Sequence, residues 1–246
     1  TGSIELETQS GSDTRFEIPD LQQRMKEYSR LSRRYQDYWP NIELDAHRKP
    51  GSPVKRIDHA LDLLRAWAHD AAAVVQEIEI NRAERADLLL IREMLAGQQE
   101  NELDYSHLAS SGAVVAARIY VLPSKTALKT LPASLLMLRT LTNDHIFLIA
   151  VGAGQELDSL ATDLSVLKGR ELVAPNWLEG RHEQAFEQTD QRLADLEDHL
   201  KALHKTLASL SEKHQLAEAL TDIYRMDWLM THVKALPVSE NFAWIT

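Results

Sequence analysis

A run of regularly spaced leucines in the C-terminal third constrains the fold of this chain more than any other feature. In the stretch "RLADLEDHLKALHKTLASL" the leucines alternate spacings of three and four residues without a miss; they are Leu193, Leu196, Leu200, Leu203, Leu207 and Leu210. This alternation keeps one apolar seam along one side of a helix, as in the heptads of coiled coils. The stretch is therefore predicted to form a long helix that packs against another helix.

A second heptad segment, from Val54 to about Gln99, supplies the partner. One series is Ile57, Leu64, Ala71 and Ile78, and the other is Ala60, Trp67, Val74, Leu88 and Leu95, which skips Asn81. Two such segments in one chain predict an antiparallel coiled coil with a seam built from Leu64, Trp67, Val74, Ile78 and the six leucines of the first run. An ordinary helical bundle, whose core faces would carry the same stripes, stays open as an alternative.

The heptad phase slips after Leu210, and a shifted stripe of Leu216, Leu220, Ile223 and Met230 continues to Pro237. One helix over residues 181–235 would be on the order of 80 Å long at a rise of about 1.5 Å per residue. Nearer the N-terminus, a helix is predicted from Pro19 until Pro40 stops it, and a Pro-rich loop follows.

The segment between the two heptad regions has a different pattern. "AARIYVLPS", "HIFLIAVGA" and "RELVAP" are short β-rich runs, and "QELDSLATDLSVLKG" is an amphipathic helix that ends at Gly169. The stretch "TALKTLPASLLMLRTLTND" is predicted to be helical after Pro132. The order β-α-β-α-β over residues 112–176 indicates a small α/β lobe.

The predicted fold class is α+β and mostly helical. A long antiparallel coiled coil carries the small α/β lobe at its tip. The predicted segments are an N-terminal helical part with a linker (1–53), an outgoing helix (54–111), the lobe (112–176), a returning helix (177–237) and the start of a strand (238–246).

Charge and composition exclude several classes of function. A net charge of −10 argues against nucleic-acid binding, which needs a surplus of Lys and Arg, and suits a basic partner better. With no cysteine, the chain has no disulfide, thiolate zinc site or cysteine nucleophile. Its longest apolar stretch, Ile146 to Ala153, is far shorter than the roughly 20 residues that span a bilayer.

Two short motifs are typical of enzymes but incomplete. In "VGAGQE", Gly152 and Gly154 lie between a predicted strand and a helix, as in a dinucleotide-binding turn, but Leu157 stands at the third glycine position. "RHEQAF" begins like a zinc-protease helix, but Phe186 replaces the second His. No catalytic residue, metal ligand, cofactor or small-molecule substrate is therefore predicted. A small α/β nucleotide-binding enzyme with helical extensions remains an alternative hypothesis.

The last residues, "NFAWIT", follow the long helix that ends at Pro237. This junction resembles the one in subunit I (also called subunit a) of rotary V-type and archaeal-type ATPases, where a strand after the long helix leads into Gly-Trp. The order of elements is also similar over residues 16–246: a helical arm, a lobe with strands like "RIYVLPSK", "HIFLIAVGA" and "RELVAP", and a returning helix. The resemblance implies a second, proximal lobe at the base of the coiled coil, of which this chain holds only remnants, with residues 238–246 as the start of a proximal-lobe strand. On this resemblance, the chain is expected to be a fragment that lacks the start of the proximal lobe and the membrane half.

The resemblance implies a non-catalytic stator arm at the cytoplasmic face of the membrane, in a proton- or sodium-translocating V-type ATPase. The implied partners are peripheral-stalk subunits E and G, the rotor-cap subunit, which is called C or d, and the rotor ring, which the membrane half would contact. No nucleic-acid partner is implied. The candidate stalk-contact residues in the lobe are Arg118, Tyr120, Lys125, Lys129 and Arg139.

A coiled-coil scaffold or chromosome-associated arm is a third hypothesis, against which the acidic charge and the absence of an ATPase head motif weigh. If the chain is a fragment, its terminal strand lacks neighbours, so Phe242 and Trp244 are expected to be less buried than the leucine seam.

Overall fold

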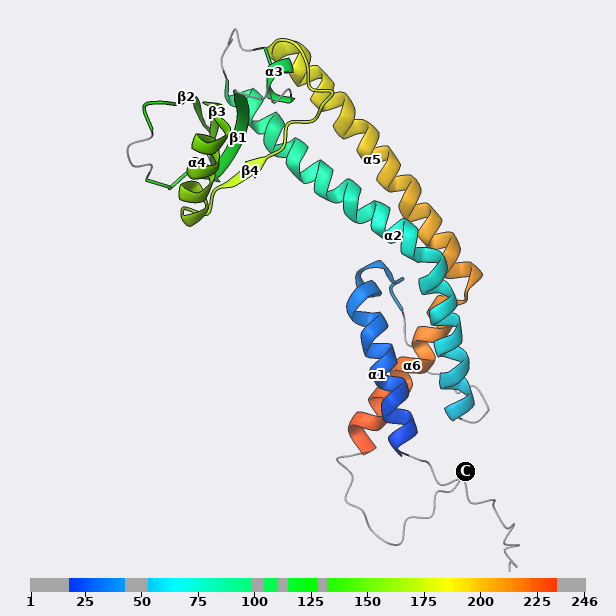
Figure 1. The fold of residues 1–246 in the computed structure, drawn as a ribbon. Coiled ribbons are helices and arrows are strands. Elements are labelled where there is room, and N and C mark those ends of the chain that lie inside the picture. The colour runs from blue at the N-terminus through cyan, green and yellow to red at the C-terminus, as the bar shows by residue number, and fades with distance from the viewer. Residues whose placement is uncertain (1–17, 43–52, 99–103, 110–114, 128–131, 234–246) are drawn as a thin grey trace, which may run out of the picture. The chain divides into compact units, whose positions relative to one another are not determined.

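The computed structural model describes residues 18–42, 53–98, 104–109, 115–127 and 132–233 (Figure 1). The chain divides into two compact units, residues 1–75 with 205–246, and residues 76–204. Two long helices, α2 (Pro53–Gly97) and α5 (His182–Lys213), contribute residues to both. The predicted fold class, a mostly helical α+β protein with long helices packed together, is confirmed. Phe242, Trp244 and the proximal-lobe strand lie outside the described residues.

The first unit contains a helical bundle. It is built from α1 (Ile18–Tyr35), the short 3-10 helix η1 (Gln36–Tyr38), the first part of α2, and α6 (Leu216–Val233). The ring of Trp67 is fully buried and meets the Tyr35 ring edge-on, with 5.6 Å between the centroids. Tyr28 makes a similar edge contact with Tyr224, at 6.1 Å. These aromatic pairs join α1 to both α2 and α6.

The expectation of one continuous helix over residues 181–235 is wrong. The helix ends at Lys213, and α6 begins at Leu216 after Gln215, whose φ of 49° is left-handed. A left-handed residue is a common way to end a helix, because it redirects the chain while local hydrogen bonds satisfy the last carbonyls. Leu216 and Leu220 are then fully buried in the bundle. The phase slip in the leucine pattern thus marks a helix boundary.

The second unit is organised around a sheet with the strand order β2-β3-β1-β4. All neighbouring strands are antiparallel. The strands are β1 (Ala116–Pro123), β2 (Leu136–Leu141), β3 (His145–Gly152) and β4 (Arg170–Leu172). We call the sheet together with helix α4 (Gly154–Val166) the lobe.

The lobe sheet is covered on both faces (Figure 1). Tyr120 and Leu122 point to one face, where they pack with leucines of α4. Ile119 and Val121 point to the other, where they pack with residues of α2, α5 and the short helix α3 (Ser106–Ala109). The alternation of side chains along a strand explains why consecutive residues of β1, from Ile119 to Leu122, are all buried. The sheet therefore lies between α4 and the ends of the two long helices.

The predicted helix after Pro132 is also wrong, because residues 136–141 form strand β2. Short apolar runs have no periodicity that distinguishes a strand from a helix. Here β3 decides the conformation: Asn143 and Asp144 form a two-residue turn, and the Thr142 N–H donates to the His145 carbonyl at 2.9 Å. The order is therefore β-β-β-α-β, and the Asn-Asp pair between apolar runs was the sequence signal for a hairpin.

Helix α4 ends at Val166, three residues before the predicted glycine end. The left-handed residue is Lys168, with a φ of 62°. Its N–H donates to the Ser165 carbonyl at 3.0 Å, and the Gly169 N–H donates to the Leu164 carbonyl at 2.8 Å. This is a Schellman motif in which glycine occupies the position after the left-handed residue. A Cβ on Gly169 would lie 2.9 Å from the Leu164 oxygen.

Glycine is expected to be the more stable residue at both of these neighbouring positions, so introducing it at one and removing it at the other should have opposite effects. Lys168→Gly should raise the free energy of unfolding by about 0.5–1 kcal/mol, because glycine adopts the left-handed conformation without steric cost. Gly169→Ala should lower it by about 1–3 kcal/mol, because the added methyl group meets a backbone oxygen. Urea denaturation of both variants measures the difference. A loss of stability in both would contradict the assigned ending of α4.

Candidate functional site

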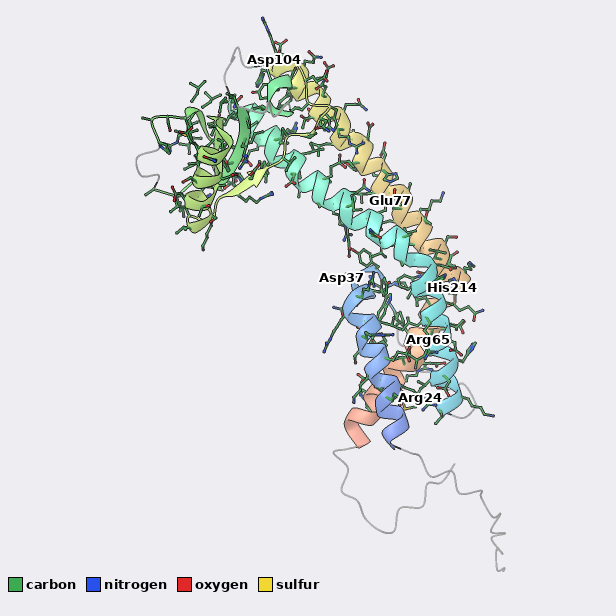
Figure 2. All side chains as sticks on the ribbon, viewed as in Figure 1. Arg24, Asp37, Arg65, Glu77, Asp104 and His214 are labelled. Atoms are coloured by element: carbon green, nitrogen blue, oxygen red, sulfur yellow. The ribbon has the colours of Figure 1, made fainter. Side chains whose placement is uncertain are left out.

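Within residues 76–204, the two long helices are antiparallel and are joined by ion pairs. Arg192 on α5 donates two hydrogen bonds to Glu84 on α2, at 2.7 and 3.0 Å. His199 also pairs with Glu77, at 2.8 Å between Nε2 and Oε1 (Figure 2 labels Glu77). Partner numbers on α5 fall as those on α2 rise, so the helices run in opposite directions. Because these side chains are 31–49% exposed, water weakens the pairs, which fix register more than they add stability.

The structure places the predicted seam residues at different depths. Leu64, Trp67, Ile78, Leu196, Leu203 and Leu207 are buried, whereas Val74, Leu193, Leu200 and Leu210 are half-buried. Val75, which lies outside both predicted series, is buried in place of Val74. In a straight helix, residues seven positions apart do not point in quite the same direction. After several heptads, a neighbouring residue therefore faces the partner helix in place of the predicted one. The skipped residue, Asn81, is buried, and its Nδ2 donates to the Glu77 carbonyl at 2.7 Å.

In the first unit, ion pairs join the helices of the bundle. Arg24 pairs with Asp58, and Arg65 with Glu27 at 2.6 Å, between α1 and α2 (Figure 2 labels both arginines). Arg56 on α2 pairs with Asp222 on α6.

Asp70 on α2 lies beside the side chains of Lys213 and His214 at the end of α5. Lys213 Nζ and His214 Nε2 lie 2.8 and 2.9 Å from its Oδ2. The hydrogen bonds from Lys213, and then from His214, lower the pKa of Asp70 from 3.8 to about 2. The carboxylate is therefore charged at neutral pH, beside the break between α5 and α6.

Asp70 is expected to make the protein sensitive to acid. Because its folded pKa is below the unfolded value, its stabilisation is present above about pH 4 and is lost as the pH falls toward about 2. In Asp70→Asn, the melting temperature should depend less on pH in this window. Melting curves across the window measure the slope, with Asp163→Asn, at an exposed position on α4, as the matched control. Equal slopes for Asp70→Asn and the unsubstituted protein would contradict this role.

A buried hydrogen-bonded chain joins the lobe to the ends of the long helices. The Tyr105 hydroxyl donates to Gln98 Oε1, and Gln98 Nε2 donates to Thr140 Oγ1 on β2 at 3.1 Å. The Tyr105 N–H donates to the Gly180 carbonyl, just before α5, at 2.9 Å. Burial raises the pKa of Tyr105 to about 12, so its hydroxyl remains a donor at neutral pH. We call this region the junction.

Further contacts seat the β2-β3 hairpin on the last turns of α2. Glu93 accepts from Thr142 Oγ1, and its Oε2 lies 2.9 Å from His145 Nδ1. His182 Nε2, on α5, lies 2.7 Å from the Leu95 carbonyl. A Cβ on Gly97 would be 3.0 Å from the methyl groups of two threonines, so the hairpin approaches α2 closely. Sequence reasoning missed this junction, because no spacing along the chain indicates which polar residues meet.

The predicted stalk-contact residues are not brought together in one patch. Arg118 pairs with Asp158 on α4, at 2.8 Å. Tyr120 is 1% exposed, and its hydroxyl donates to the Leu157 carbonyl at 3.0 Å, so its side chain belongs to the core of the lobe. The remaining candidates described by the structure are Lys125 and Arg139, which are exposed and make no ion pair with any described residue. Lys129 lies outside the described residues.

The "VGAGQE" turn does not offer space for a pyrophosphate. A Cβ on Gly152 would lie 2.2 Å from a methyl carbon of Leu135, so the lobe itself fills this position. Glu156 lies in the first turn of α4, where its negative charge opposes a phosphate. Strand β1 also separates β3 from β4, whereas a dinucleotide-binding unit has adjacent parallel strands. The geometry therefore disfavours the nucleotide-binding hypothesis.

Two further features of the described residues bear on other functions. No group of three or more His, Asp or Glu side chains among them is placed to hold a metal ion. None of the helices in the described ranges has the length and apolarity needed to cross a membrane.

Comparisons with known proteins give one similarity of fold. No protein-family model matches the chain, and none of the curated proteins matches its sequence. Among solved structures, the chain is similar to the cytoplasmic N-terminal domain of subunit I, a homolog of subunit a, of V-ATPase. The TM-score is 0.46 at 16% identity, over 86% of this chain and 71% of the other.

Proposed function

We propose that this chain is a non-catalytic stator arm of a rotary V-type ATPase that translocates protons or sodium ions. It would act at the cytoplasmic face of the membrane, where it would anchor the peripheral stalks to the membrane sector. The proposal is supported chiefly by one observation: two antiparallel long helices are joined to a small lobe that lies between them in the sequence.

A stator must resist the torque of the rotor, which requires stiffness rather than chemistry. The buried seam residues Ile78, Leu196 and Leu203 stiffen the helix pair against bending, and the Arg192–Glu84 pair opposes sliding of α5 along α2. At the junction, Tyr105 and Gln98 oppose rotation of the sheet against the helix ends. Each of these contacts lies within residues 76–204, so this unit can transmit a load between the helices and the lobe.

The proposed partners are peripheral-stalk subunits E and G, the rotor cap and the membrane rotor ring. For the stalk contact we propose Lys125 and Arg139, which are exposed cations on an acidic protein. Arg118 would contribute only if its pair with Asp158 opened.

Purification of the tagged chain from its native cells tests the function. We expect mass spectrometry to identify stalk and rotor-cap subunits of a rotary ATPase in the purified material. Lys125→Glu combined with Arg139→Glu should reduce recovery of the stalk subunits, because it reverses both proposed contact charges. Arg85→Glu is the matched control, since it reverses one exposed charge on α2 of the same unit.

The results separate the hypotheses. Recovery of no ATPase subunit would overturn the stator function. Recovery of chromosome-associated proteins in their place would favour the scaffold hypothesis. Heat released on titration with NAD or ATP would favour the nucleotide-binding hypothesis, despite the side chain of Leu135 in the turn.

A further inference from the structure

Strand β2 has a hydrogen-bonded neighbour on one side only, as far as the described residues extend. It stands at the end of the strand order, next to β3. Natural edge strands are usually shortened, charged or covered, because their free N–H and C=O groups can pair with another chain. On β2, Leu136, Leu138 and Leu141 are 76%, 36% and 60% exposed, so this edge is only weakly protected.

The register of the hairpin identifies the groups at the free edge. Thr142 and His145 close the turn as a hydrogen-bonded pair, and in antiparallel sheets such pairs alternate with non-bonded pairs. Thr140 and Leu138 therefore direct their N–H and C=O groups toward β3. The residues that direct these groups toward the free side are Met137, Arg139 and Leu141.

The two faces of β2 differ in chemistry. Leu136 and Leu138 lie on the face covered elsewhere by the long helices, since Leu138 is opposite Ile149 of that core. Arg139 lies on the α4 face, opposite Leu148. Arg139 is exposed and has no ion pair among the described residues, in a protein with a net charge of −10.

We propose that β2 binds an extended segment of another protein in which apolar and acidic residues alternate. Such a segment would add a strand to the sheet by hydrogen bonds to the N–H and C=O groups of Met137, Arg139 and Leu141. Its apolar side chains would cover Leu136 and Leu138, and an acidic side chain on its other face would pair with Arg139. The alternation required of the partner follows from the alternation of β2.

A second copy of the chain fits this edge less well. Antiparallel pairing of two β2 strands centred on Arg139 would place two arginines directly opposite each other, which is unfavourable. Each copy also carries a net charge of −10, so the two would repel. This inference shares Arg139 with the proposed stalk contact but does not depend on the stator function, because its test concerns the isolated chain and the class of segment that it binds.

Binding of a blocked peptide of about six residues, alternating valine and glutamate, tests the proposal. Heteronuclear NMR on the full chain should show shifts of the amide signals of β2 and slower hydrogen exchange at Met137, Arg139 and Leu141. A matched peptide with lysine in place of glutamate should bind at least about tenfold more weakly, because it would face Arg139 with a like charge.

Variants at one position separate the backbone contribution from the charge. Arg139→Pro removes an outward N–H and the cation, yet leaves the ladder to β3 intact, so it should abolish binding while the β3 signals stay in place. Arg139→Ala should bind both peptides alike, and Arg139→Glu should prefer the lysine peptide. Unshifted β2 signals at peptide saturation, or equal binding by Arg139→Pro, would overturn the proposal. So would a dimer in sedimentation that Arg139→Pro dissociates, since a second copy would then occupy the edge.

Discussion

Trp67→Ala is expected to lower the free energy of unfolding by about 3–5 kcal/mol, the largest effect of a single substitution in the helical bundle. Trp67 is fully buried, and the edge-on contact with Tyr35 ties α1 to α2. The substitution would leave a cavity beside the Tyr35 ring, because the surrounding helices relax only partly around a deleted side chain. The loss should therefore exceed the transfer free energy of the indole alone.

Chemical denaturation measures this effect, and hydrogen exchange locates it. Amides of α1 should lose protection, because Tyr35 of this helix packs against the emptied position. Ile80→Ala is the matched control: Ile80 is an apolar residue on the same helix but is 57% exposed, so its loss should change stability by less than about 0.5 kcal/mol. Similar losses in the two variants would show that the bundle core is not centred on Trp67.

Tyr105→Ala is expected to cost about 3–5 kcal/mol, because it removes a fully buried ring from the core beneath the sheet. It also removes the donor to Gln98, which links α2 to Thr140 of β2. The substitution should thus loosen the junction as well as destabilise the lobe.

Tyr105→Phe separates these two contributions. The ring remains, but Gln98 Oε1 loses this donor in a buried site, at a cost of about 1–2 kcal/mol. Urea denaturation gives the stability, and hydrogen exchange at Thr140 and Tyr105 reports the junction. If Tyr105→Phe costs nothing and leaves exchange unchanged, the hydrogen-bonded chain does not hold the lobe to the helices.

The elements that the sequence predicted best are those with a repeating pattern of apolar residues. The two heptad segments predicted two long antiparallel helices, since burial on one side of a helix requires this spacing. The leucine pattern shows the phase slip at Leu216. However, glutamine is not a residue type that predicts a left-handed conformation, as glycine or asparagine at position 215 would have done. For this reason two helices were predicted as one.

Strand β2, the burial of Tyr120 and the junction depend on contacts with residues far away in the sequence. Residues 136–141 form a strand only because β3 lies beside them, and their composition favours a helix equally well. Tyr120 was a reasonable surface candidate by type, but α4 covers it. The junction links residues 98, 105 and 140 across two helices and a strand, so no local pattern could reveal it.

Photo-crosslinking in native cells tests the proposed stator function most directly. A photoreactive amino acid at position 125, on the exposed turn after β1, should form an adduct with a peripheral-stalk subunit of a rotary ATPase, identified by mass spectrometry. The same group at position 85, on the exposed side of α2, should not form that adduct. Adducts from position 125 only with proteins outside any rotary ATPase would contradict the stator function.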